Sequence, residues 1–268
     1  MTPLNKIKQA SKAALAAITL TFASLGANAA LIPAELSIDG TVTFDDGSSF
    51  GATSGSFSVT NLGIDTTSSF TGGVITDTNP LTISSSETGD GFGINGSAST
   101  TNDEFVIGFD AILNVTNTSL TDSFDITFEL IFDNLVNGAS EDSYAQSHFE
   151  ILEGGAFLFD TYLMSDTAGG NINSDGTATG FGGELQESGT QSFTFSLAPS
   201  EILSLAFSWT ADGGEYFDAD SASVNFSQSF KVKSATNTSG QPQPVPEQTS
   251  ILLVALSLVL LGRKKLSK

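Results

Sequence analysis

The sequence Phe105-Val-Ile-Gly-Phe-Asp-Ala-Ile-Leu-Asn-Val115 decides the fold class. Its residues alternate between an apolar set that begins at Phe105 and a set that includes glycine, aspartate and asparagine. Successive side chains of a β-strand point to opposite faces, so this period of two predicts a strand with one buried face. The stretch Phe124-Asp-Ile-Thr-Phe-Glu-Leu-Ile-Phe132 repeats the pattern. Because residues 116–123 are rich in turn formers, we expect the two strands to pair as a hairpin.

The same alternation extends through residues 30–233, which we expect to form one acidic ectodomain. Further strands are predicted at residues 36–44, 56–60, 81–84, 143–151, 156–163, 191–197, 203–209 and 221–232. No long helical period occurs there, and the chain's 21 phenylalanines supply bulky core residues. We therefore predict an all-β fold, a single antiparallel β-sandwich of jelly-roll type with about ten to twelve strands. A closed barrel is the alternative.

The N-terminus has the pattern of a secretory signal peptide. Three lysines lie among the first twelve residues, and residues 13–25 form an apolar run. Ala27 and Ala29 are small residues at the positions that a signal peptidase recognises, so we expect residues 1–29 to be removed before Ala30. The chain contains no cysteine, so an exported domain would have no disulfide and would depend on its core for stability.

The C-terminus has the order of a sorting signal. A short motif, an apolar run and a basic cluster follow one another: Val245, Pro246 and Glu247; residues 251–261; and Arg263, Lys264 and Lys265. At about 1.5 Å per residue, a helix over the apolar run falls short of a hydrocarbon core about 30 Å thick. We expect a short transmembrane helix that serves as a transient anchor, with the basic cluster on the cytoplasmic side.

These C-terminal residues resemble the PEP-CTERM sorting signal, which exosortases process in Gram-negative bacteria that have exopolysaccharide systems. Gln248 stands where the family usually has a second proline. The resemblance covers residues 245–268 only. It implies transit through the inner membrane, recognition by an exosortase at residues 245–247, and release to the cell surface or the extracellular matrix.

The ectodomain is strongly acidic. Between residues 30 and 246 there are 29 acidic residues and only Lys231 and Lys233 as bases, which gives a formal charge of −27. Nucleic acid and anionic lipid are disfavoured as partners because both require a basic surface. Solubility in a crowded exterior, binding of divalent cations and attraction to a basic partner remain open as explanations. Residues 234–244 are polar and contain proline, so we expect a linker there.

Clustered carboxylates precede two of the predicted strands. Glu141 and Asp142 precede residues 143–151, and Asp218 and Asp220 precede residues 221–232. Carboxylate oxygens at a strand entry are suitable ligands for Ca²⁺, so we regard these four residues as a candidate metal site. Solvated turns are the alternative.

Aromatic residues suggest a possible sugar contact. Tyr216 and Phe217 lie in a stretch rich in glycine and acidic residues, where exposed rings can stack on sugars. Trp209 instead shares the parity of Leu203, Leu205 and Phe207, which predicts a core position.

The sequence favours no catalytic set. His148 is the only histidine, and we expect it on the outward face of its strand together with Gln146. Ser147 would point to the opposite face, so it cannot form a nucleophile–base pair with His148. Adjacent carboxylates are frequent, but with so many acids such pairs carry little information. We therefore expect no enzyme.

The function expected from these features is that of an exported cell-surface or exopolysaccharide-matrix (biofilm) protein with a structural or interaction role. Its partners would be signal peptidase and exosortase during export and extracellular polysaccharide afterwards. The alternatives are a Ca²⁺-dependent, lectin-like carbohydrate-binding module and a glycoside hydrolase that uses acidic residues.

Overall fold

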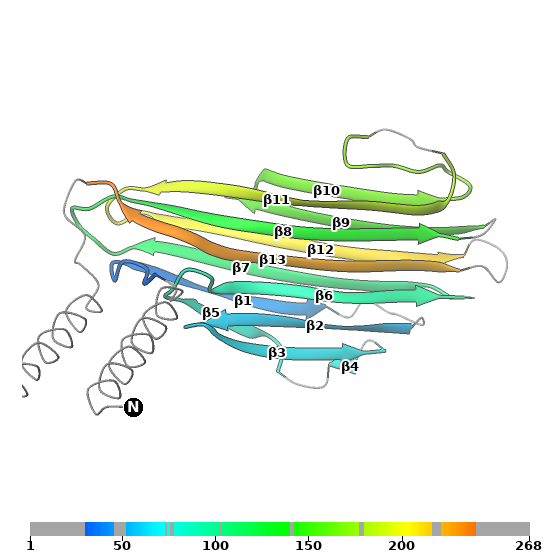
Figure 1. The fold of residues 1–268 in the computed structure, drawn as a ribbon, viewed down its shortest axis with the longest axis horizontal. Helices are drawn as coiled ribbons and strands as arrows, with labels where there is room; N and C mark the ends of the chain where they lie inside the picture. The colour runs from blue at the N-terminus through cyan, green and yellow to red at the C-terminus, as the bar shows by residue number, and fades with distance from the viewer. Residues whose placement is uncertain are drawn as a thin grey trace, which may run out of the picture. The chain divides into compact units, whose positions relative to one another are not determined.

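The computed structural model describes residues 30–45, 52–72, 74–75, 78–101, 103–139, 142–176, 180–215 and 221–239. Within these ranges the chain forms thirteen strands (Figure 1): β1 (Leu36–Asp45), β2 (Ala52–Asn61), β3 (Ile64–Thr71), β4 (Val74–Ile75), β5 (Leu81–Ser85), β6 (Gly91–Thr100), β7 (Phe105–Asn117), β8 (Phe124–Gly138), β9 (Ser143–Glu153), β10 (Ala156–Asp166), β11 (Gly183–Leu197), β12 (Ile202–Glu215) and β13 (Ala222–Asn237). The described residues contain no helix that is long and apolar enough to span a membrane. The predicted signal peptide and sorting signal lie outside them.

Eight of the strands form a jelly roll. β6 pairs with β13, β7 with β12, β8 with β11, and β9 with β10, all antiparallel, so the four ladders are nested around the β9–β10 hairpin. This arrangement divides the strands between a six-stranded sheet, β10-β9-β12-β7-β1-β5, and a seven-stranded sheet, β11-β8-β13-β6-β2-β3-β4. β1 and β5 extend the first sheet, and β2, β3 and β4 extend the second. The predicted jelly-roll sandwich is confirmed.

The predicted hairpin between residues 105–115 and 124–132 is wrong. β7 pairs with β1 and β12, whereas β8 pairs with β11 and β13 in the other sheet. Both strands bury alternate residues in one shared core, which they approach from opposite sides. The connection between the strands therefore crosses from sheet to sheet. Asn117 supports it, because its Nδ2 donates to the carbonyl oxygens of Asp122 and Ala198, each at 2.8 Å.

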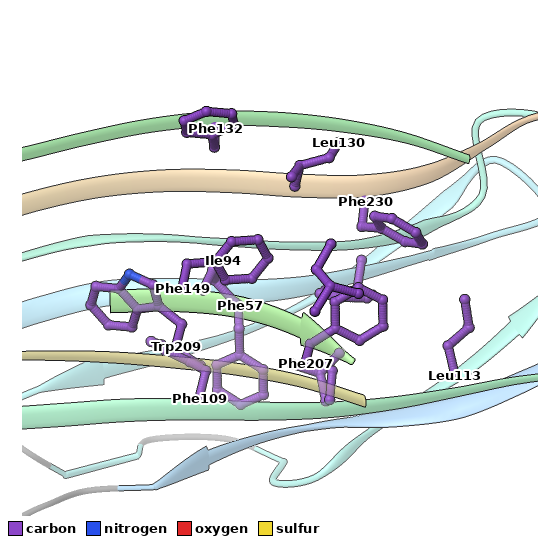
Figure 2. Packing of buried hydrophobic residues seen from close by; sticks show 14 of the residues in the cluster. Phe57, Ile94, Phe109, Leu113, Leu130, Phe132, Phe149, Phe207, Trp209 and Phe230 are labelled. Carbon is purple, nitrogen blue, oxygen red and sulfur yellow. The ribbon is translucent and has the colours of Figure 1, made fainter. Parts of the chain in front are cut away.

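The core lies between the two sheets and combines many aromatic rings with aliphatic side chains (Figure 2). The ring centroids of Trp209 and Phe226 are 4.0 Å apart, and those of Phe128 and Phe230 are 4.9 Å apart. Trp209 is 1% exposed, as its parity predicted, and its Nε1 donates to Ser147 Oγ at 3.1 Å. A buried indole needs such an acceptor, so the hydroxyl stabilises the position of the ring.

The sequence pattern missed strands that contain few apolar residues. β3 and β6 are rich in serine, threonine and glycine, and β6 buries little more than Phe92, Ile94 and Ala98. β13 continues to Asn237, so it includes the first four residues of the predicted linker. A register shift between Val232 and Ser234 interrupts the alternation there, and this irregularity explains why the pattern predicted an earlier end.

Candidate functional site

The outer face of the six-stranded sheet carries a cluster of polar and aromatic side chains on β9, β10 and β12. Tyr162 of β10 lies opposite His148 of β9, and Met164 lies opposite Gln146. Asp212 of β12 pairs with Gln146 from the other side. These residues alternate with buried neighbours, so they share the outward parity of their strands, and Asp160 has the same parity on β10 as Tyr162. We call Gln146, His148, Asp160, Tyr162 and Asp212 the outer-face cluster.

His148 forms an ion pair with Asp160 when its imidazole is protonated. The His148 Nε2 atom lies 2.7 Å from Asp160 Oδ1, and the two side chains are 38% and 51% exposed. The His148 ring stands nearly perpendicular to the Tyr162 ring, at 81° and a centroid distance of 5.7 Å. The predicted outward position of His148 is therefore confirmed. Ser147 is buried and accepts the indole hydrogen bond, so serine and histidine do lie on opposite faces.

Tyr162 and Asp212 are connected through Gln146. The Tyr162 hydroxyl donates to Gln146 Oε1 at 2.7 Å. Burial raises the pKa of Asp212, a hydrogen bond from Gln146 lowers it, and the nearby Glu104 carboxylate raises it, with a net rise. Burial and then the charge of Asp212 also raise the pKa values of Tyr144 and Tyr162. The carboxyl group of Asp212 thus lies in a polar surface from which water is partly excluded.

Among the residues that the structure describes, no lysine or arginine belongs to the strands of this sheet. Lys231 and Lys233, the two bases of the ectodomain, belong to β13 in the other sheet. Lys233 Nζ lies 2.5 Å from Glu129 Oε1 on the neighbouring strand β8. The outer-face cluster therefore presents carboxylates, an amide, an imidazole and a phenol ring on one face of this sheet.

The structure brings together the two loops of the predicted calcium site only at their ends. Ser143 pairs with Glu215, and the Ala139 amide donates to the Ser221 carbonyl at 2.9 Å. Asp142 lies in the described turn before β9, but Glu141, Asp218 and Asp220 are outside the described residues, as are the predicted sugar contacts Tyr216 and Phe217. In the ranges that the structure covers, no three histidine, cysteine or acidic side chains are grouped to hold a metal ion.

An open groove of about 430 Å³ lies near the other end of β12. β12 pairs with β9 only from Leu205 onward, so residues 202–204 have no neighbour on that side. These residues form the wall of the groove together with residues 194–197 of β11, Glu153 and Glu201. No pattern in the sequence indicates this groove, because it results from the short β9–β10 hairpin.

Asp90 is a carboxylate that sequence analysis also missed. It is fully buried, and its Oδ2 accepts hydrogen bonds from the amides of Leu62, Ser86 and Glu87 at 2.8–3.0 Å. Its Oδ1 accepts from the Gly63 amide at 3.0 Å. Burial raises the pKa of Asp90, but these four hydrogen bonds lower it more, so the net pKa is lowered. The carboxylate thereby joins the β2–β3 turn, where Leu62 and Gly63 have positive φ, to the start of β6.

The fold and the outer-face cluster define an acidic jelly-roll domain with polar and aromatic side chains on the outer face of one sheet. No protein-family model and no curated protein matches the chain. Among solved structures, the capsid of infectious bursal disease virus, Gx strain, is 8% identical, with 89% of this chain and 76% of that chain covered and a TM-score of 0.19. A β-glucosidase from Kluyveromyces marxianus is 11% identical over 85% of this chain and 21% of that chain, with a TM-score of 0.21. Scores this low carry no argument about function.

Proposed function

We propose that this chain is an exported protein of the cell surface or exopolysaccharide matrix, with a non-catalytic binding role in which the outer-face cluster is the contact surface. The pairing of the side chains within that cluster supports the proposal. His148 is fixed by Asp160, and Tyr162 is fixed by Gln146, at 2.7 Å in each case. Side chains held by one another on a rigid sheet form a preorganised binding surface.

The proposed route of export depends on the two ends of the chain. The leader at residues 1–29 supports secretion, and the PEP-CTERM-like tail at residues 245–268 supports sorting by an exosortase. The test is the intact mass of the protein recovered from each cell fraction of its host. A surface or extracellular form that starts at Ala30 and ends near Glu247 is expected. A membrane form that still ends at Lys268 would show instead that the tail is a permanent anchor.

The proposed binding role is tested with the protein as its host releases it. We expect the purified protein to sediment with isolated extracellular matrix and to remain unbound when the matrix polysaccharide has been removed enzymatically. A protein that stays in the supernatant in both cases would contradict the binding role. Release of reducing sugar from the matrix by the protein would contradict the non-catalytic part.

A Ca²⁺-dependent, lectin-like role is a second candidate. It is favoured by the hydrogen bond between Ala139 and Ser221, because these two residues stand next to the acidic sequences that contain Glu141 and Asp142 and Asp218 and Asp220. The expected result is matrix binding that is lost in a chelator and restored by Ca²⁺. Equal matrix binding with and without Ca²⁺ would contradict the Ca²⁺-dependent role and leave the metal-independent binding role.

A further inference from the structure

Aromatic side chains recur at a regular interval along the outer face of β9 and β10. Phe157 lies opposite Leu152, and Tyr162 lies opposite His148. Tyr144 lies four residues before His148, on the same face of β9. Because a strand rises about 3.3 Å per residue, the three aromatic positions are about 13 Å apart and extend over about 26 Å. We call Tyr144, His148, Phe157 and Tyr162 the aromatic strip.

A β-bulge places Phe157 in this strip. The register of β10 against β9 shifts between Phe157 and Phe159. Phe159 packs inward, with its ring centroid 5.4 Å from that of Phe132, whereas Phe157 is 73% exposed. In a strand with regular alternation, Phe157 and Phe159 would have the same parity and both would point into the core. Bulges commonly redirect a side chain in this way, and here the result is a large exposed ring at the end of a polar face.

The positions between the aromatic rings carry hydrogen-bond acceptors. Glu150 lies opposite Asp160, and Gln146 lies beside Asp212. Each of these two pairs forms a row of hydrogen-bond acceptors that lies between two neighbouring aromatic positions of the strip. Asp160 is already paired with His148, and Asp212 with Gln146. The carboxylates are thus partly satisfied within the face. They remain available to hydroxyl donors.

Charge excludes one large class of ligands. The strands of the six-stranded sheet contain no lysine or arginine, and the ectodomain has a formal charge of −27. A polymer that carries carboxylate or sulfate groups would be repelled from this face. A neutral polyol has no such penalty, and its hydroxyl groups can donate to the acceptor rows while its apolar C–H surfaces pack against the aromatic rings.

We propose that the aromatic strip binds an extended, uncharged polysaccharide. Sugar rings stack at the three aromatic positions, and their hydroxyl groups donate to Glu150 and Gln146 between them. The proposal rests on the matrix-binding function proposed above and specifies the ligand class of that face. Because the strip extends over about 26 Å, an oligosaccharide shorter than this reaches fewer than three aromatic positions. Affinity should therefore rise with chain length until the strip is filled.

The experiment measures binding of the protein, in the form that its host releases, to soluble polysaccharides by affinity electrophoresis. The neutral probes are hydroxyethyl cellulose, galactomannan and laminarin, and the anionic probe is alginate. We expect retardation by at least one neutral probe and none by alginate. Phe157→Ala and Tyr162→Ala are each expected to weaken the binding about tenfold, the loss of one aromatic contact. Phe181→Ala is the matched control, because Phe181 is also 73% exposed but lies outside the strip.

Several outcomes would overturn the proposal: no retardation of the wild-type protein by any neutral probe, tighter binding to alginate, or equal effects of Phe157→Ala and Phe181→Ala. Binding to polylysine that the strip variants abolish would assign the face to a basic protein instead. Thermal unfolding of each variant checks that the fold is intact. If the strip variants still sediment with the host matrix as the wild type does, the matrix-binding function stands and the aromatic strip is not its site. If the wild type does not sediment, the matrix-binding function itself fails.

Discussion

Asp90 and Asp212 are both carboxyl groups withdrawn from solvent in an acidic domain, but their surroundings differ. Asp90 accepts four backbone hydrogen bonds and is fully buried, and its pKa is lowered. Asp212 lies on the outer face beside Gln146, without comparable backbone donors, and its pKa is raised. The first carboxylate is fully used in joining two turns. The second is held at a surface where its capacity to accept hydrogen bonds is only partly used.

This difference separates structural from functional acids in a chain with 30 of them. A buried carboxylate whose oxygen atoms are all occupied by backbone amides stabilises the fold and has nothing left for a ligand. A carboxyl group whose neighbours are side chains on an exposed sheet adds little stability, but it can meet a partner. The following substitutions test this distinction, beginning with the largest expected effect.

Asp90→Asn should destabilise the domain strongly. The asparagine keeps the size of the side chain, but its amide group must face at least one backbone N–H that now has no acceptor. We expect the free energy of unfolding to fall by about 3 kcal/mol, because a buried donor left unsatisfied costs about 1–3 kcal/mol and the charge is lost as well. Chemical denaturation at pH 7 measures the change.

Asp65→Asn is the matched control for that substitution. Asp65 is an exposed residue of β3 near the same turn, and its Oδ1 accepts from Thr60 Oγ1 at 2.6 Å. Its loss should change the free energy of unfolding by no more than about 0.5 kcal/mol, as at most surface positions. Equal effects of Asp65→Asn and Asp90→Asn would remove the structural role assigned to Asp90.

The structural role of Asp90 could not be predicted from the sequence, because its hydrogen-bond partners are backbone amides, and two of them are distant in the chain. The amides of Leu62 and Gly63 lie more than 25 positions away, and no residue pattern distinguishes Asp90 from the other acids. Alternation did predict the strands that are rich in apolar residues, their buried faces and the jelly-roll class. It could not predict strand neighbours, as the wrong hairpin between residues 105–115 and 124–132 shows, because any two half-buried strands can cover the same core.

The outer-face cluster was predictable only in part. Parity alone placed His148 and Gln146 outward. The contact of Gln146 with Asp212 required the pairing of β9 with β12, which joins residues far apart in the chain. Phe157 could not be predicted to point outward, because the bulge reverses the parity that it would share with Phe159. Bulges are set by local backbone geometry and have no clear pattern of hydrophobic residues.

The effect of pH on Asp90 provides a second test. Since folding lowers the pKa of Asp90, its stabilisation is fully present above the ordinary value of 3.8 and is lost as pH falls through that value toward the lower folded pKa. The difference in free energy of unfolding between wild type and Asp90→Asn should therefore narrow below about pH 4. Denaturation curves from pH 7 to pH 3 measure this narrowing. A constant difference would show that charge plays no part.

Asp212→Asn should raise the free energy of unfolding, and by less than Asp90→Asn lowers it. Since folding raises the pKa of Asp212, the stability that it contributes is present below the ordinary value of 3.8 and is lost as pH rises through the raised folded pKa. At pH 7 the asparagine avoids holding a charged carboxylate in a partly dry site. We expect the free energy of unfolding to rise by about 0.5 kcal/mol at pH 7. Below pH 3.8, the ordinary pKa of an aspartic acid side chain, we expect no change. Lower stability at pH 7 would place Asp212 with Asp90 as a structural acid.

Asp160→Asn should affect stability least, yet it should weaken binding. The ion pair with His148 is exposed, and Glu150 lies opposite Asp160, so relief of that repulsion offsets part of the lost attraction. We expect a change of less than about 0.5 kcal/mol in the free energy of unfolding. The His148 ring then loses the partner that orients it, so neutral-polysaccharide affinity should fall about threefold, well under the 1.4 kcal/mol that a tenfold loss represents. Asp110→Asn, an exposed change on β7 of the same sheet, is the control and should leave binding intact. A fall of more than about 1 kcal/mol in the free energy of unfolding of Asp160→Asn would mean that Asp160, like Asp90, stabilises the fold.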